Sequence, residues 1–127
     1  MENWMWWAVA GVAVYMAMKP GIPAAAQLSP GDVRDAISAS KDLQLIDVRT
    51  PEENKAGRIA GSKLIPLGEL SGRLGEIDKS KPVILYCRSG NRSGQALKIL
   101  FASGYKDAKH LQGGIGAWSA AGLPVAK

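Results

Sequence analysis

Hydrophobic residues follow two different patterns along the 127 residues of this chain. Residues 4–18 carry no charge and have no polar side of a helix, so we expect one apolar N-terminal helix outside the globular core. The remaining chain alternates short apolar runs with polar segments. This alternation predicts strands that alternate with helices, and therefore an α/β fold with a largely parallel sheet.

Four short apolar runs predict strands, at residues 43–48, 63–67, 82–87 and 109–112. The third run (PVILYC) is apolar along nearly its whole length, which is typical of a strand buried on both faces. We therefore expect residues 82–87 to form a central strand of the sheet.

Helices are predicted between these strands. Ser29 and Thr50 each precede a proline and have an acidic residue three positions later, a pattern typical of a capped helix start. Three more helices are predicted over residues 69–77, 93–103 and 115–121. The first of them is expected to be weak, because two glycines interrupt it.

The N-terminal apolar segment favours contact with a lipid bilayer. A helix over residues 4–18 is about 22 Å long, which is short of the roughly 30 Å of a bilayer core, and a helix that starts at Met1 has a marginal length of 18 residues. Three tryptophans near one end and Tyr15 near the other are typical of side chains at a membrane surface. We predict a single-pass anchor that contacts the bilayer through residues 4–18. A cleaved signal segment is the alternative, with cleavage near Ala26 and export of the rest of the chain.

The residues after this segment divide the chain further. Lys19 and Arg34 follow the apolar run and no basic residue precedes it, which favours the cytoplasmic side of the membrane for the domain. Residues 19–27 are rich in proline, glycine and alanine and are predicted to form a linker. This leaves residues 28–127 as one domain.

Charge and composition exclude several kinds of site. The net charge of +5 belongs to residues 28–127, because residues 1–27 carry one lysine and one glutamate. No aromatic residues are interleaved with the basic ones, so we expect no nucleic-acid partner. A single cysteine excludes a disulfide within the chain and any multi-cysteine metal cluster. Any Cys/His pair would consist of Cys87 and His110, but we interpret His110 as a surface or packing residue.

Cys87 is the candidate catalytic residue. It ends the predicted central strand, and functional sites in parallel sheets form at the carboxyl ends of strands. The candidate binding residues follow it in one loop: Arg88, Ser89, Gly90, Asn91, Arg92 and Ser93. Two arginines, inward-turned loop amides and the start of the next helix would all stabilise an anion. They would also lower the pKa of the thiol, and a decrease of about two units would raise the thiolate fraction at pH 7 from about 3% to about 75%.

Four ordered motifs resemble those of single-domain rhodaneses, which are thiosulfate-type sulfurtransferases. The resemblance covers residues 28–125. The motifs are Ile46-Asp47-Val48-Arg49 with Pro51-Glu52-Glu53, then Gly57-Arg58-Ile59-Ala60-Gly61-Ser62, the Cys87–Ser93 loop, and Gly113-Gly114-Ile115-Gly116-Ala117-Trp118 with Gly122-Leu123-Pro124.

The resemblance implies a rhodanese-like, five-stranded parallel sheet flanked by helices. It implies that Cys87 takes a sulfane sulfur from a small anionic donor such as thiosulfate and passes it to a thiol or cyanide acceptor. Arg88 and Arg92 would bind the donor's anionic group, and the amides of residues 88–93 would hold the persulfide. The resemblance implies neither a metal nor an organic cofactor.

Some residues of these motifs are expected to act structurally. The family often has histidine where this chain has Arg58, which we interpret as neutral for the chemistry. Asp47 and Arg49 are predicted to form an ion pair or caps at a strand end, and Trp118 to pack the last helix on the sheet.

Two other functions use the same residues. Cysteine phosphatases and arsenate reductases on this fold need arginine six positions after the cysteine, but here Arg92 lies five positions after Cys87 and Ser93 takes the sixth. A non-catalytic, membrane-tethered persulfide carrier is the second alternative. It needs the same cysteine as the enzyme, and turnover distinguishes the two.

Overall fold

The computed structural model of the protein describes residues 21–127. The predicted apolar helix and bilayer anchor lie outside the described residues. Within the described part of the chain, no helix is both long enough and apolar enough to cross a membrane.

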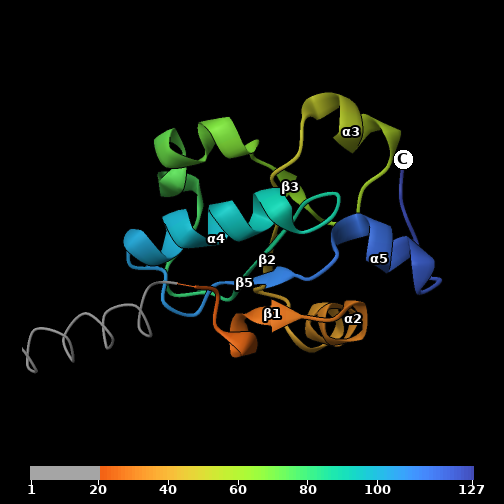
Figure 1. Ribbon diagram of the computed structural model, residues 1–127, viewed down its shortest axis with the longest axis horizontal. Coiled ribbons are helices and arrows are strands. Elements are labelled where there is room, and N and C mark those ends of the chain that lie inside the picture. Colours follow the sequence, from red (N-terminus) through yellow and green to blue (C-terminus); the bar gives the residue numbers. More distant parts are fainter. Residues whose placement is uncertain (1–20) are drawn as a thin grey trace, which may run out of the picture.

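A five-stranded sheet forms the centre of the domain, with every neighbouring pair of strands parallel (Figure 1). The order across the sheet is β1-β5-β4-β2-β3. The strands are β1 (Gln27–Leu28), β2 (Gln44–Asp47), β3 (Lys63–Leu64), β4 (Val83–Tyr86) and β5 (Lys109–Leu111). The parallel α/β architecture expected from the sequence is therefore confirmed.

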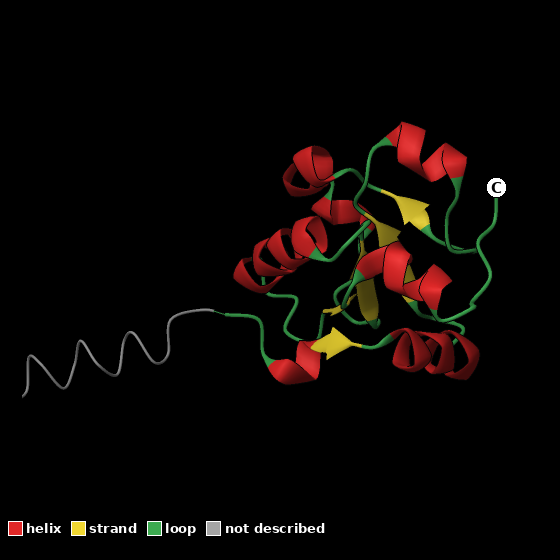
Figure 2. Cartoon of the chain, turned by 45° about the vertical axis from the view of Figure 1, so that its right-hand side comes forward, coloured by secondary structure: helices red, strands yellow, loops and turns green. Residues whose placement is uncertain are grey.

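Helices cover both faces of this sheet (Figure 2). The α-helices are α2 (Pro30–Ala39), α3 (Pro51–Ala56), α4 (Asn91–Ala102) and α5 (Gly114–Ala120). Three short 3-10 helices accompany them: η1 (Ala24–Ala26), η2 (Leu67–Gly72) and η3 (Leu74–Glu76). One hydrophobic cluster joins α4 and η2 to the sheet, and a second joins α2 and α5 to its other face.

The central strand β4 contributes to both clusters. Its four residues are all buried, and alternate side chains point to opposite faces of a strand. Leu85 and Cys87 belong to the cluster beneath α4, whereas Ile84 and Tyr86 belong to the cluster with Trp118. The predicted central strand is thus confirmed, and Cys87 follows directly at its carboxyl end.

Local sequence signals place the starts of two helices correctly. The Ser29 hydroxyl accepts a hydrogen bond from the Asp32 amide before α2, and Asp32 accepts one from the Ser29 amide. The same reciprocal arrangement joins Thr50 and Glu53 before α3. Each arrangement satisfies backbone donors that the first turn of a helix leaves unpaired.

The structure differs from the sequence expectations at short elements. The helix expected over residues 69–77 is instead the two 3-10 helices η2 and η3, because glycines disfavour a continuous α-helix there. The strand expected over residues 63–67 is limited to Lys63–Leu64, since η2 begins at Leu67.

The range expected as a linker also contains ordered structure. Ala26 of η1 is buried, and Gln27 pairs with His110 in the edge strand β1. Neither element has a strong local pattern, because each consists of two or three residues held by contacts with the rest of the domain.

Candidate active site

Cys87 lies where β4 meets the loop that leads to α4. The residue is 1% exposed, and its carbonyl oxygen accepts a hydrogen bond of 2.8 Å from the Ile115 amide at the start of α5. Strand β4, the loop and two helix starts therefore fix the position of the sulfur.

The loop is folded around this sulfur. The Gly90 amide donates a hydrogen bond of 3.0 Å to Cys87 Sγ, and the Ser93 hydroxyl oxygen lies 3.5 Å from the same atom. Gly90 has φ of 102°, in the left-handed region that favours glycine, and a Cβ there would lie 3.2 Å from the Gly113 nitrogen. The Gly90 amide is thus a loop donor that contacts the sulfur, and the cradle formed by the amides of residues 88–93 stays a prediction.

These contacts change the ionisation of the thiol. Burial opposes ionisation and is the largest single effect on the pKa of Cys87. Hydrogen bonds from the Ser93 side chain and from the amides of Ser93, Gly90 and Ser89 together outweigh burial, so the pKa of the thiol is lowered. Helix α4 begins at Asn91, and the positive end of its dipole acts in the same direction. The site therefore favours a nucleophilic thiolate.

The start of α5 packs against the back of this loop. Gly114 has φ of 63°, and a Cβ there would lie 2.5 Å from the carbonyl oxygen of Arg88. The Gly116 amide donates a hydrogen bond of 3.1 Å to that oxygen. Gly114 is therefore required for the close approach of two backbone segments.

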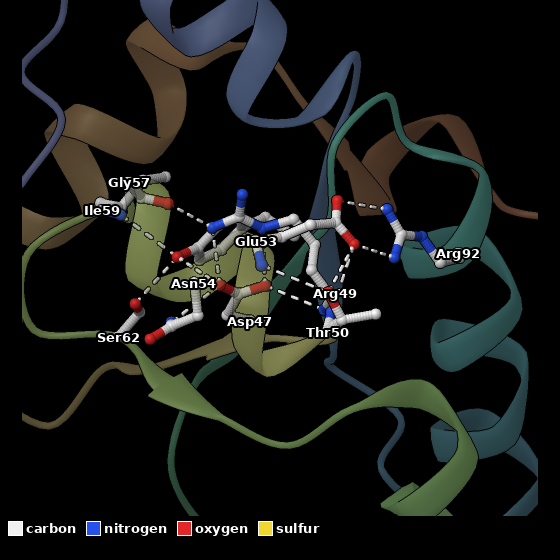
Figure 3. A network of polar contacts seen from close by, with 10 residues as sticks. Asp47, Arg49, Thr50, Glu53, Asn54, Gly57, Ile59, Ser62 and Arg92 are labelled. Carbon is white, nitrogen blue, oxygen red and sulfur yellow. Dashed lines mark hydrogen bonds and ion pairs between the residues drawn. The ribbon is translucent and has the colours of Figure 1, made fainter. Parts of the chain in front are cut away.

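Arg92 is held by a residue that sequence reasoning did not assign to the site. Its guanidinium donates two hydrogen bonds to the Glu53 carboxylate, of 2.6 and 2.8 Å, across the space between α4 and α3 (Figure 3). The hydrogen bond from Arg92 is the main cause that lowers the pKa of Glu53 from 4.5 to about 2. The positive charge of Arg92 is thus largely neutralised in this structure.

Arg88 is in a different situation. Its side chain is exposed and has no ion-pair partner within residues 21–127. It lines a pocket of about 340 Å³ beside the loop. The other lining residues are Arg49, Glu53, Ala56, Gly57, Ile115, Gly116, Ser119 and Val125. Of the two predicted donor-binding arginines, Arg88 therefore carries the available charge.

Comparison with known proteins assigns this chain to a family. The family model named Rhodanese-like domain matches residues 29–121. The chain belongs to the rhodanese-like family. A "Sulfurtransferase" of Allochromatium vinosum is 40% identical over 89 residues, covering 70% of this chain and 83% of that protein. The "Probable adenylyltransferase/sulfurtransferase MoeZ" of Mycobacterium tuberculosis is 40% identical over 94 residues, covering 72% of this chain but only 24% of that protein.

A solved structure agrees with this assignment. The rhodanese-related protein of Thermoplasma volcanium is 32% identical, with a TM-score of 0.72, and the match covers 79% of this chain and 96% of that one. The parallel five-stranded sheet flanked by helices is thus the rhodanese-like fold.

The ion pair predicted for Asp47 and Arg49 is confirmed. The Asp47 carboxylate accepts hydrogen bonds from the Arg49 guanidinium at 2.8 and 3.0 Å and from the Asn54 amide at 3.0 Å (Figure 3). Arg49 also donates to the Gly57 carbonyl at 2.6 Å. Asp47 and Arg49 are both buried, so their charges serve to join β2 to α3.

The structure also gives the surroundings of Trp118 and Arg58. Trp118 is 3% exposed, packs between α5 and the sheet, and donates its indole N–H to the Pro124 carbonyl at 2.8 Å. Arg58 is half-buried, and its backbone pairs with Ala126. Within residues 21–127, no cluster of three or more His, Cys, Asp or Glu side chains could hold a metal ion.

His110 has a closer relation to the site than we expected. It is buried, as a packing residue would be, but its Nδ1 lies 2.8 Å from the Ser93 hydroxyl oxygen that faces Cys87. The only signal in the sequence was its place in the short strand predicted over residues 109–112. Strand order, which a single sequence does not reveal, was needed to interpret it.

Proposed function

We propose that this protein is a sulfurtransferase that moves a sulfane sulfur from an anionic, thiosulfate-like donor through a Cys87 persulfide to cyanide or a thiol. The observation that carries this proposal is the buried Cys87 sulfur at the end of β4, held by the Gly90 amide at 3.0 Å and adjacent to the Ser93 hydroxyl. Family membership and the sulfurtransferase relative support it.

The proposed reaction has two steps. The Cys87 thiolate attacks the outer sulfur of thiosulfate, the S–S bond of the donor breaks, and sulfite leaves with the bonding electron pair. Cys87 then carries an anionic persulfide. Cyanide attacks the terminal sulfur, and the Cys87–sulfur bond breaks to give thiocyanate and the original thiolate. A thiolate acceptor would leave as a persulfide instead, and neither route needs an external oxidant or reductant.

The loop after Cys87 stabilises the negative charge on sulfur in the thiolate and in the persulfide. Hydrogen bonds to an anionic sulfur are stronger than those to a neutral thiol, so the Gly90 amide and the Ser93 hydroxyl favour the thiolate. The amides of residues 88–93 would hold the persulfide in the same way. Arg88, at the neighbouring pocket, would attract the anionic group of the donor, and Arg92 would contribute to the extent that Glu53 releases it.

Turnover tests this function and distinguishes it from a persulfide carrier. The purified full-length chain is expected to produce thiocyanate from thiosulfate and cyanide, and Cys87→Ser is expected to abolish production. Cys87→Ser with wild-type activity would refute the mechanism. A Cys87 persulfide that is detected by mass spectrometry but never yields thiocyanate would instead establish the carrier.

We also propose that the protein is tethered to a lipid bilayer through residues 4–18, with its domain on the cytoplasmic side. The uncharged apolar run and Lys19 after it support this placement. Cleavage near Ala26 would remove Ile22 and Ala26, which both pack against the core, so this packing supports the uncleaved form. The expected result is an unprocessed mass for the protein in the membrane fraction. A mature N-terminus at Gln27 would establish the exported form.

A further inference from the structure

His110 lies behind the sulfur site and has no part in the chemistry proposed above. It belongs to β5 and is 4% exposed. Its Nδ1 is 2.8 Å from Ser93 Oγ, and Ser93 Oγ is 3.5 Å from Cys87 Sγ. A histidine from β5, a serine from α4 and the cysteine after β4 thus form one chain of polar contacts.

The surroundings of the imidazole determine where its proton lies. Burial is the only cause that lowers the pKa of His110, so the ring is neutral at pH 7 and carries one proton. Its Nε2 has no hydrogen-bond partner among the described residues. A proton there would leave a buried N–H without an acceptor, which proteins rarely tolerate. The proton therefore belongs on Nδ1, where Ser93 Oγ accepts it.

Among residues 21–127, the elements with the most contacts to β5 bring no free charged side chain to this arrangement. The elements that pack against β5 are η1, β1, β4 and α4, and the first three carry no charged residue. On α4, Arg92 is paired with Glu53 and Lys98 is exposed. The titratable group that faces His110 is Cys87, through Ser93.

We propose that His110 is a positioning residue for the reactive sulfur: its Nδ1–H binds Ser93 Oγ, so that the Ser93 hydroxyl proton is available to anionic sulfur on Cys87. This inference rests on the proposed function in one respect: the anionic sulfur on Cys87 is taken to be first the thiolate and then the persulfide. If the imidazole proton were on Nε2 instead, the Ser93 hydroxyl would donate its hydrogen bond to His110 Nδ1. Ser93 could then only accept a hydrogen bond from the Cys87 thiol, which would favour the neutral thiol.

The Ser93 proton has a second acceptor, the Gly90 carbonyl oxygen at 3.3 Å. A negatively charged sulfur is the stronger acceptor of the two, so the hydroxyl turns toward Cys87 when the thiol ionises. The hydrogen bond from His110 polarises this hydroxyl and strengthens its donation. Loss of the imidazole is therefore expected to lower the thiolate fraction below the pKa by about three-fold, near the upper end of what a roughly 10–30% weakening of a charged hydrogen bond produces.

The test measures ionisation of Cys87 without turnover. The rate of alkylation by iodoacetamide is followed against pH in the full-length protein and in His110→Leu, Ser93→Ala and the double variant. We expect His110→Leu to raise the pKa of Cys87 by about half a unit, and Ser93→Ala to raise it by more. In the Ser93→Ala background, His110→Leu should have no further effect, because the hydroxyl through which it acts is gone.

Two further variants separate positioning from packing. Ile22→Ala removes a side chain that packs on the same face of α4 near Gly94, and it should leave the pKa of Cys87 unchanged. His110→Asn keeps an N–H donor near Ser93, so the pKa of Cys87 in this variant should stay close to the wild-type value. This variant tests the proposal even if His110→Leu fails to fold. An unchanged pKa in folded His110→Leu would overturn the proposal, as would an equal shift with and without Ser93. Failure of sulfur transfer itself would show separately, as absence of thiocyanate from wild-type protein with a normal thiol pKa.

Discussion

Glu53 should control how strongly the site attracts its anionic donor. The Glu53 carboxylate holds Arg92 through two hydrogen bonds, so a donor anion must compete with it for that guanidinium. We predict that Glu53→Gln lowers the KM for thiosulfate and leaves kcat within about two-fold of wild type. Glutamine suits this test because its side-chain oxygen can still accept the hydrogen bonds that the Thr50 amide and hydroxyl donate at the start of α3.

The size of the effect follows from the strength of the ion pair. A decrease in the pKa of Glu53 from 4.5 to about 2 corresponds to about 3 kcal/mol, at about 1.4 kcal/mol per unit. The side chains of Arg92 and Glu53 are 32% and 28% exposed, so solvent screening reduces the coupling to about 1–2 kcal/mol. Release of Arg92 should therefore lower KM by about five- to thirty-fold at low ionic strength, and by less as salt is added.

The neighbouring Glu52 provides a matched control. It lies on the same helix and is exposed, and Glu52→Gln changes the net charge by the same amount without releasing Arg92. The assay is initial-rate thiocyanate production at varied thiosulfate concentration. Equal KM values for the two variants would refute the reasoning, because long-range charge alone would then account for any change. A higher KM in Glu53→Gln would show that Glu53 instead positions Arg92 for the donor.

Three further outcomes follow from contacts at the site. Gly90→Ala forces a side chain into the left-handed region and should cost about 1–2 kcal/mol in urea unfolding, with a raised pKa of the thiol in alkylation assays. Gly114→Ala should cost more than Gly90→Ala in the same unfolding assay, since its Cβ would lie 2.5 Å from the Arg88 backbone oxygen. Because the folded-state pKa of Glu53 is lowered, its pairing with Arg92 stabilises the fold fully above pH 4.5, and this stabilisation is lost as the pH falls toward 2. Thermal melts over this pH range should show a falling melting temperature, and the fall should be smaller in Glu53→Gln.

Much of the site was predictable because its signals are local. Cys87 and its loop follow an apolar strand, and the two capped helix starts each depend on residues three positions apart. By contrast, Glu53 and Arg92 lie 39 positions apart, and Ser93 and His110 lie 17 apart. Only the strand order and helix packing bring such pairs together, so one sequence could not identify these contacts.

The shortest elements were unpredictable for a related reason. Strand β1 contains two residues, which is too few to show an alternating pattern, and its pairing with β5 is a long-range contact. Likewise, the stretch after β3 has helix-forming residues, but the structure divides it into η2 and η3 with Arg73 between them. Strand β1 therefore depends on its long-range pairing, whereas Gly72 and Gly75 already weaken the local helical preference of the stretch after β3.

The placement of Ser93 bears on the choice between sulfur and phosphate as the bound group. A phosphatase loop on this fold would need arginine at this position, but Ser93 is fully buried with its hydroxyl 3.5 Å from Cys87 Sγ. The arginine that precedes it, Arg92, is already paired with Glu53. A tetrahedral phosphoryl group would thus meet one buried hydroxyl and a neutralised arginine, whereas a single anionic sulfur needs only the short donors that the Gly90 amide and Ser93 supply. The serine that takes the place of the phosphatase arginine also lies between the Cys87 sulfur and His110, so in the proposed function sulfur binding and its control both depend on Ser93.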